Sequence, residues 1–302
     1  MIHTELTEPE NRVPNTPTLV SPQNEVTNVP RTLTLIWQGT DPDEDSLHYE
    51  VRLFTSQTVL RQTILAQAIA DTTLVVQDLQ FNTTYFWQVI ATDPDGLSSQ
   101  SEVASFTTLP VPNLRFAWVS DTSGNAEIYA SDGSDTTIVQ VTHRAARDVQ
   151  PRLHPRLPQV AFTSEVQGET QVFVTSLIEG IPTQITQVPM AGFHNIGTGY
   201  TWSPDGGQLA YAHYQELYRI SANGSGLTVV TQAPTNRHFR EMDWTAVGNQ
   251  FVLQTIGTRI YDAEIYLYSP QEDSLRLLVA NHPGQLHSPS FSIDGQEVLF
   301  TY

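Results

Sequence analysis

The chain has 302 residues, 39% of them hydrophobic, and a formal net charge of −18 at neutral pH. All 14 basic residues are arginines and there is no cysteine, which excludes disulfides, thiolate metal sites and a catalytic cysteine or lysine. A field of this sign disfavours non-specific binding to nucleic acid or anionic lipid, because both are negative. The length allows two domains with separate cores.

The N-terminal residues carry no targeting signal that the sequence reveals. The stretch MIHTELTEPENRVPNTP lacks the basic start and apolar core of a secretory signal, which taken alone predicts a cytoplasmic chain. Residues 1–13 are polar and acidic, and they predict a flexible tail. No run of eighteen apolar residues occurs, so we expect no membrane span.

Residues 14–110 predict a β-sandwich, because six or seven short alternating segments occur with no helical period. The expected strands lie at 17–22, 33–39, 47–54, 74–76, 84–93 and 102–109. One motif in this region resembles the tyrosine corner of fibronectin type III domains; it consists of Leu79, Phe81, Thr83, Tyr85, Trp87, Val89 and Ala91. Trp37 sits where those domains place their core tryptophan, and SFTT closes the module in a similar way. LPVPNL then predicts a short, stiff linker.

Residues 111–302 repeat a unit of four short strands, seen most clearly in YTWSPDGGQLAYAHYQELYRI at 200–220. Matching first strands are anchored by Leu153, Trp202, Trp244 and Phe291. Matching second strands begin at Phe116, Val160, Leu209, Phe251 and Val298, and third strands at Glu127, Gln171, Glu216 and Glu264. A repeat of roughly 45 residues with four strands is typical of propeller blades, which stack to share a core. Asp205-Gly206, with Asp294 as the counterpart of the aspartate, tolerates positive φ at both central residues and therefore predicts a tight two-residue hairpin.

The segments WSPDGGQLAYAH and FSIDGQEVLFTY resemble the TolB-type propeller repeat, also called the WD40-like PD40 repeat. The first unit lacks its innermost strand and the last has two, so we expect about 17 strands in four or five blades. Either the C-terminal strands complete the first blade, or the ring is small or incomplete. The predicted fold class is therefore all-β: an Ig or fibronectin-III-like sandwich followed by a β-propeller.

Two acidic loops are candidates for a calcium site, the one cofactor that the sequence suggests. They carry Asp41, Asp43, Glu44 and Asp45 after one sandwich strand, and Asp93 and Asp95 after another. These loops share one end of the predicted sandwich, where carboxylate oxygens could bind Ca²⁺. The alternative is that DPDED and DPDG are solvated turns in which aspartate bonds its own backbone.

Histidines and arginines gather in the connections between propeller units. The histidines are His143, His194, His238, His282 and His287. Several imidazoles on one propeller face could bind a transition metal, or they could form a polar binding face. The arginines are Arg144, Arg147, Arg152, Arg156, Arg237 and Arg240. Because arginine is enriched at interface hot spots, these six residues predict a contact with an acidic protein partner; ordinary surface solubility is the alternative.

No GxSxG elbow and no glycine-rich phosphate loop occurs. The resemblance implies a binding platform, so we expect a non-enzymatic, periplasmic or extracellular interaction protein. Its expected role is that of a scaffold or accessory subunit in a larger membrane-bound or envelope complex, with protein subunits as partners. The alternative is a metal-dependent polysaccharide lyase or hydrolase that uses histidines at the mouth of the propeller channel.

Overall fold

The computed structural model of the chain describes residues 10–55, 63–134, 138–177, 180–192, 199–259, 261–282 and 284–302. Its secondary structure is β throughout these residues, apart from one 3-10 turn at Val247–Asn249. The chain divides into two compact units, Met1–Val111 and Pro112–Tyr302. No helix among the described residues has the length and hydropathy needed to cross a membrane.

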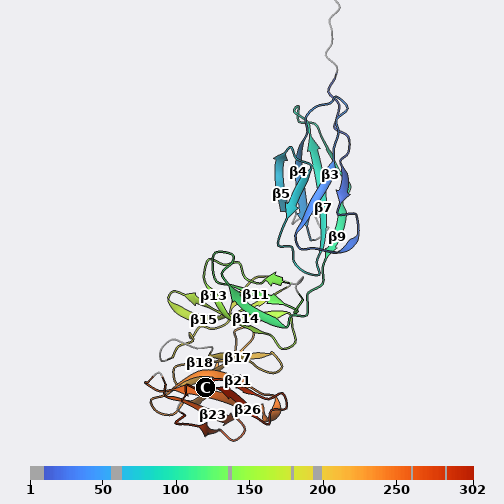
Figure 1. Ribbon diagram of the computed structural model, residues 1–302. Helices are drawn as coiled ribbons and strands as arrows, with labels where there is room; N and C mark the ends of the chain where they lie inside the picture. Colours follow the sequence, from blue (N-terminus) through green and yellow to red (C-terminus); the bar gives the residue numbers. More distant parts are fainter. Residues whose placement is uncertain are drawn as a thin grey trace, which may run out of the picture. The chain divides into compact units, whose positions relative to one another are not determined.

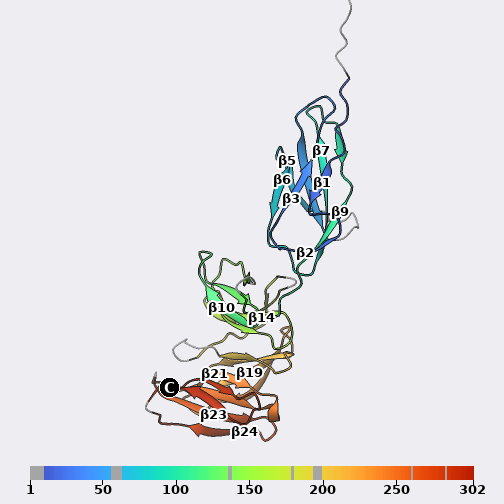
Figure 2. The ribbon, with the colours of Figure 1, turned by 45° about the vertical axis from the view of Figure 1, so that its right-hand side comes forward.

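The first unit is a sandwich of two sheets (Figures 1 and 2). The smaller sheet has the order β1-β3-β6, formed by β1 (Thr18–Ser21), β3 (Leu33–Gln38) and β6 (Thr73–Val76). The larger sheet has the order β2-β9-β7-β4-β5, with β8 also paired to β7. Its strands are β2 (Val26–Val29), β4 (His48–Phe54), β5 (Thr63–Ile69), β7 (Thr84–Thr92), β8 (Ser98–Gln100) and β9 (Ala104–Thr108).

The sandwich core lies between these sheets and is built on Trp37 and Trp87, whose side chains are buried. The Tyr85 hydroxyl accepts a hydrogen bond from the backbone N–H of Gln80 at 2.9 Å, which is the contact that a tyrosine corner requires. The strands β2, β5 and β8 were not expected from the sequence: β2 and β8 are short, and the apolar residues of β5 (TILAQAI) do not alternate with polar ones.

The described residues of the second unit form five consecutive antiparallel sheets, which follow one another in chain order from green to red in Figure 1. The first sheet is β10 (Phe116–Ser120), β11 (Glu127–Ser131) and β12 (Ile138–Gln140). The second is β13 (Asp148–Leu153), β14 (Gln159–Val166), β15 (Glu169–Ser176) and β16 (Thr183–Gln184). The third is β17 (Tyr200–Trp202), β18 (Gln208–His213), β19 (Glu216–Ser221) and β20 (Thr228–Gln232). The fourth is β21 (His238–Trp244), β22 (Phe251–Ile256), β23 (Ala263–Ser269) and β24 (Ser274–Val279). The fifth is β25 (His287–Phe291) and β26 (Val298–Thr301).

This arrangement confirms the expected propeller-type repeat with four or five blades. Among the strand pairings of the described residues, β25 and β26 pair with each other and with no strand of the first sheet. The C-terminal strands therefore do not complete the first blade.

Each sheet packs its apolar side chains against the next sheet. Ala161 of the second sheet shares a core with Trp202 and Tyr211 of the third. In the same way, Ala210 of the third sheet packs with Leu253 of the fourth. The fifth sheet is also held by carboxylates of β21: Asp243 accepts a hydrogen bond from the Phe291 backbone N–H at 2.9 Å, and Glu241 accepts one from the Ser288 N–H.

The Asp-Gly hairpin differs from the expected two-residue connection, and only one of its two central residues has positive φ. Gly206 has φ +79°, whereas Asp205 is not among the residues with positive φ. The Asp205 carboxylate instead accepts hydrogen bonds from the Ser203 hydroxyl at 2.6 Å and from the Gly207 N–H at 2.9 Å. These bonds lower the pKa of Asp205 and close a wider turn than a two-residue loop.

Candidate functional site

The antiparallel order of each sheet places the predicted histidines and arginines at two ends. Asp148, at the start of β13, pairs with Ser164 near the end of β14, and Ser164 pairs with Gln171 near the start of β15. We call this the connection end, because the chain enters each sheet here from the preceding one. The opposite end, which carries Asp205, is the Asp-Gly end.

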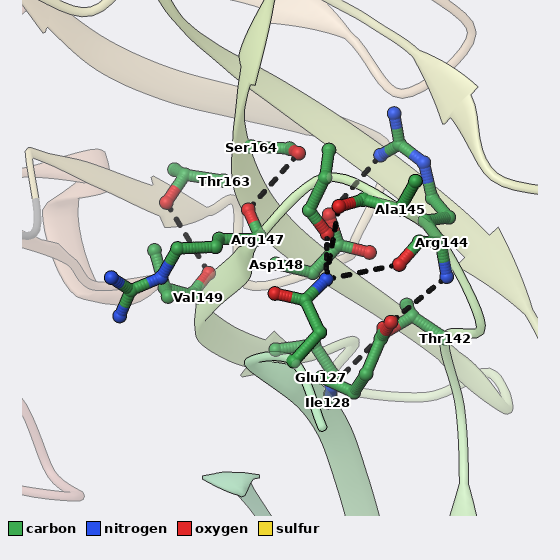
Figure 3. A network of polar contacts seen from close by, with 12 residues as sticks. Glu127, Ile128, Thr142, Arg144, Ala145, Arg147, Asp148, Val149, Thr163 and Ser164 are labelled. Carbon is green, nitrogen blue, oxygen red and sulfur yellow. Dashed lines mark hydrogen bonds and ion pairs between the residues drawn. The ribbon is translucent and has the colours of Figure 1, made fainter. Parts of the chain in front are cut away.

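A buried polar network lies at the connection end, where the first sheet meets the second (Figure 3). Glu127 and Asp148 are 3% and 0% exposed, and Thr142 is 1% exposed. The Glu127 carboxylate accepts hydrogen bonds from the Thr142 hydroxyl and, at 2.9 Å, from the Arg144 backbone N–H. The Arg144 guanidinium pairs with Asp148 Oδ1 at 3.2 Å. The Arg144 guanidinium thus pairs with Asp148, whereas Glu127 is held by a hydroxyl and a backbone N–H.

The second carboxylate oxygen of Asp148 is buried, and it accepts no hydrogen bond from the residues that the structure describes. The neighbouring Ser164 hydroxyl donates to the Arg147 carbonyl at 3.1 Å. Burial raises the pKa of Asp148 and Glu127 adds to the rise, although Ser164, Arg144 and Thr142 favour the charged form. Asp148 is therefore held against a cost of desolvation that the single ion pair only partly offsets.

The segment from His143 to Arg147, here called the basic loop, has its backbone fixed by this network. The Asn125 side-chain amide donates to the carbonyls of Arg144, Ala145 and Ala146 at distances of 2.8–3.2 Å. The Arg144 guanidinium also lies over the Phe173 ring, 4.3 Å from its centre. His143 and Arg147 remain exposed, so the basic loop presents these two side chains from a held backbone.

The six predicted arginines do not form one surface. Arg152 and Arg156 are exposed, but they lie toward the Asp-Gly end, across the length of β13 from the basic loop. Arg237 is 11% exposed and pairs with Asp262 at 3.0 Å and Glu264 at 2.9 Å. Arg240 is half-buried, and its Nε has no hydrogen-bond partner among the described residues.

The predicted histidines also occupy separate places. His143 is exposed in the basic loop, and His194 lies outside the described residues. The His238 ring contacts Tyr214, and burial together with nearby His213 lowers the pKa of His238. His282 contacts the Tyr302 ring at 4.5 Å, while His287 pairs with Thr301 across the fifth sheet. Within the described ranges, no three His, Asp or Glu side chains are grouped so that they could hold a metal ion.

The acidic loops of the first unit are occupied by residues that we expected in the flexible tail. Arg12 donates from its backbone N–H and its guanidinium to Asp43, at 2.7 and 2.8 Å, and the Asn11 amide donates to Asp93 at 2.9 Å. The hydrogen bonds from Arg12 lower the pKa of Asp43. Asp41 accepts the N–H of Asp43, and Asp93 accepts the N–H of Asp95, as in the turn interpretation. A calcium ion would have to displace Arg12, so calcium binding stays a prediction.

Sequence reasoning did not single out Asn125, Glu127 or Asp148 as members of a site. Glu127 opens a third strand as Glu216 and Glu264 do, so its repeat position was visible, but its burial was not. In the second sheet Gln171 takes the same place and accepts the Thr186 hydroxyl at 2.6 Å. The hydrogen bond from a threonine hydroxyl therefore recurs in the second sheet, whereas the buried negative charge does not.

The chain is similar to known proteins over parts of their length. No family model matches the chain. A TolB protein homolog of Chlorobaculum tepidum is 26% identical over 115 residues, which is 37% of this chain and 25% of that protein. Among solved structures, Kuenenia stuttgartiensis hydrazine synthase has a TM-score of 0.50 at 10% identity, over 85% of this chain and 42% of that one. TolB from Acinetobacter baumannii has a TM-score of 0.49 at 14% identity, over 83% of this chain and 57% of that one.

These identities indicate a shared fold and no more. The matched part spans a quarter of the curated relative, so the whole relative's activity and partners do not transfer to this chain. The network itself is poorly suited to chemistry, because its carboxylates and the Thr142 hydroxyl are buried and hydrogen-bonded to one another. Its effect is to hold the basic loop in one conformation.

Proposed function

We propose that this chain is a non-enzymatic protein-interaction module that works in the periplasm or outside the cell. In this role it is a scaffold or accessory subunit of a larger membrane-bound or envelope complex. The TolB-type repeat and the sequence similarity to a TolB homolog support this assignment. The site that we assign to partner binding is the basic loop.

One observation carries the assignment of the basic loop. Asn125 holds three consecutive carbonyls of the loop, and Ser164 and Glu127 hold the groups that flank them. A loop that is already ordered loses little conformational entropy on binding. Its exposed Arg147 is a cation on a chain of net charge −18, so an acidic protein surface is the partner that its charge fits.

The experiment is affinity purification of partners from solubilised envelope fractions of the source organism, using the full chain as bait. The Arg147→Glu bait is compared with wild type, and Arg276→Glu, an exposed arginine on β24, serves as the matched control. We expect a stoichiometric partner that is retained by the control and bound about tenfold more weakly by Arg147→Glu. Equal recovery with both variants, or no stoichiometric partner with wild type, would overturn the proposal.

The lyase or hydrolase alternative finds no site in the described part of the chain. The four predicted histidines that can be placed lie on different strands or loops, and no three His, Asp or Glu side chains among the described residues are grouped so that they could hold a metal ion. Elemental analysis of the purified chain tests this alternative directly. A stoichiometric transition metal would bring the alternative back.

A further inference from the structure

The turn between β19 and β20 contains Asn223-Gly224, the one Asn-Gly pair in the sequence. Asn223 is exposed, and Gly224 has φ +83° and no Cβ that would shield its backbone nitrogen. In such a pair the glycine nitrogen can attack the carboxamide carbon of the asparagine. The turn therefore holds the groups that a covalent modification of asparagine needs.

The carboxamide of Asn223 is held and polarised by Ser225. Asn223 Oδ1 accepts hydrogen bonds from the Ser225 backbone N–H at 3.0 Å and from the Ser225 hydroxyl at 2.7 Å. These bonds fold the carboxamide back along the backbone of Gly224, which lies between the two residues. Two donors on Oδ1 also stabilise the negative charge that this oxygen gains when a nucleophile adds to Cγ.

A hydrogen bond of the same turn opposes the reaction. The Gly224 N–H donates to the Ser221 carbonyl at 2.8 Å, and this bond must break before the nitrogen can attack. Gly224 also lies against the second sheet, where a Cβ on it would be 3.1 Å from the Ile185 carbonyl. The reaction therefore requires a local opening of the turn, which an exposed loop undergoes without unfolding of the sheets.

The equivalent turn of the first sheet shows that an aspartate fits at this position. Asp132 lies between β11 and β12, and its Oδ1 accepts the N–H and the hydroxyl of Ser134 at 2.9 and 2.7 Å. Gly133, between them, has φ +98°. The turn in the first sheet thus has an aspartate where the turn in the third sheet has Asn223, with the same two hydrogen bonds.

We propose that Asn223 is a site of spontaneous covalent modification, which converts it to aspartate and isoaspartate through a cyclic imide formed with Gly224. The Gly224 nitrogen forms a bond to Cγ, the bond from Cγ to Nδ2 breaks, and the displaced proton leaves with Nδ2 as ammonia. Water then adds to one of the two imide carbonyls. Opening at Cγ gives aspartate, and opening at the main-chain carbonyl gives isoaspartate.

The two products should differ in their effect on the fold. Aspartate keeps the Oδ1 acceptor for Ser225, as Asp132 does for Ser134. Isoaspartate adds one carbon atom to the main chain before Gly224, which shifts Gly224 relative to the Ile185 carbonyl and disrupts the turn. Either product adds a negative charge to a chain of net charge −18.

The test is incubation of the folded full chain at mildly alkaline pH, with peptide mapping by mass spectrometry over time. Asn82 is the internal comparison, because it is also exposed but is followed by Thr83. We expect Asn223 to be converted at least about tenfold faster than Asn82, with isoaspartate among the products. Equal rates at the two residues would overturn the proposal, as would a conversion of Asn223 that occurs only in denaturant.

Two variants test the roles assigned within the turn. Ser225→Ala removes the hydroxyl donor and should slow the conversion of Asn223, whereas an unchanged or faster rate would overturn the role of Ser225. Asn223→Asp reproduces the aspartate product and should melt at the temperature of the wild-type chain. The isoaspartyl form, separated by chromatography from aged wild type, should melt at a lower temperature; equal melting of the two forms would contradict the disruption of the turn.

Discussion

The His154 ring donates a hydrogen bond from Nε2 to the carbonyl of Gly206 at 3.2 Å, linking the loop after β13 to the loop after β17. Its Nδ1 accepts the backbone N–H groups of Arg156 and Leu157 at 3.0 and 2.9 Å, which fixes the tautomer. The ring also meets Trp202 edge-on. His154 thus joins the second and third sheets at the Asp-Gly end, as Arg144 and Asp148 join the first and second at the connection end.

Gly206→Ala should destabilise the second unit by roughly 2–4 kcal/mol, because two costs add. A side chain is strained at φ +79°, and the new Cβ would lie 2.0 Å from the His154 ring. Gly168→Ala is the matched control, since its φ of +85° is similar and no atom lies within 4 Å of its Cβ. Chemical denaturation of both variants measures the difference. Equal losses of stability in the two variants would show that the His154 ring moves away from the new Cβ without a cost in free energy.

The stability that His154 contributes should depend on pH. Burial lowers the pKa of His154, and Arg156 lowers it further against the opposing effects of Gly206 and Asp205. A depressed pKa means that the unfolded chain binds the proton more tightly. The contribution is therefore complete above about pH 6.5, the ordinary histidine value, and is lost as the pH falls through the folded pKa. The stability difference between wild type and His154→Gln should shrink from pH 7 to pH 5; a constant difference would contradict this assignment.

Asp148→Asn should be better tolerated at high pH than at low pH. The pKa of Asp148 is raised in the fold, so its contribution is complete below the unfolded value and is lost as the pH rises through the folded pKa. Asparagine keeps the shape and removes the second buried charge beside Glu127. We expect the stability of the variant relative to wild type to rise with pH in denaturation experiments at pH 4 to 8. The opposite slope would show that Asp148 is stabilised as an anion by Arg144.

Tyr211→Phe should raise stability slightly, by up to about 1 kcal/mol. The Tyr211 side chain is 0% exposed, and its hydroxyl has no hydrogen-bond partner among the described residues. Tyr200→Phe is the matched comparison in the same core, because the Tyr200 hydroxyl donates to the carbonyls of Gln150 and Ala161. That variant should lose about 1–2 kcal/mol. Thermal unfolding measures the stability of both variants. A loss of stability in both would show that the Tyr211 hydroxyl has a hydrogen-bond partner.

Calcium should leave the melting temperature of the wild-type chain unchanged, because Arg12 and Asn11 already satisfy Asp43 and Asp93. Arg12→Ala releases Asp43 and is the variant in which a calcium-dependent rise should first become measurable. Thermal melts with calcium, with magnesium and with a chelator make the comparison. A calcium-specific rise in wild type that is lost in Asp43→Asn would instead establish the predicted site.

Much of the fold was predictable because it depends on local periodicity. Alternation around Trp202 and Tyr211 predicts paired strands, and the recurrence of that pattern predicts stacked sheets. The strand β8 was missed because three polar residues carry no periodic signal. Its pairing with β7 depends on the tertiary fold.

The candidate site was less predictable, because charge in the sequence does not reveal which partner neutralises it. Arg237 was predicted to contact a partner protein, yet Asp262 and Glu264 surround it. Arg12 was assigned to a flexible tail and instead pairs with Asp43. His154 lies in LHPRLPQVAFTS, a segment that aligns with WSPDGGQLAYAH but has no Asp-Gly pair. Only the neighbouring loop shows that a histidine there bridges two sheets.

The dependence of the fifth sheet on Asp243 and Glu241 has a consequence for how the second unit comes apart. Among the described residues, each sheet packs against its neighbours in the series, so cooperativity passes from one sheet to the next along the chain. The amide protons of β25 and β26, at the end of this series, should then exchange with solvent sooner than those of β22. The second unit would then open one sheet at a time from this end, and Asp243 and Glu241 would hold the sheet that opens first.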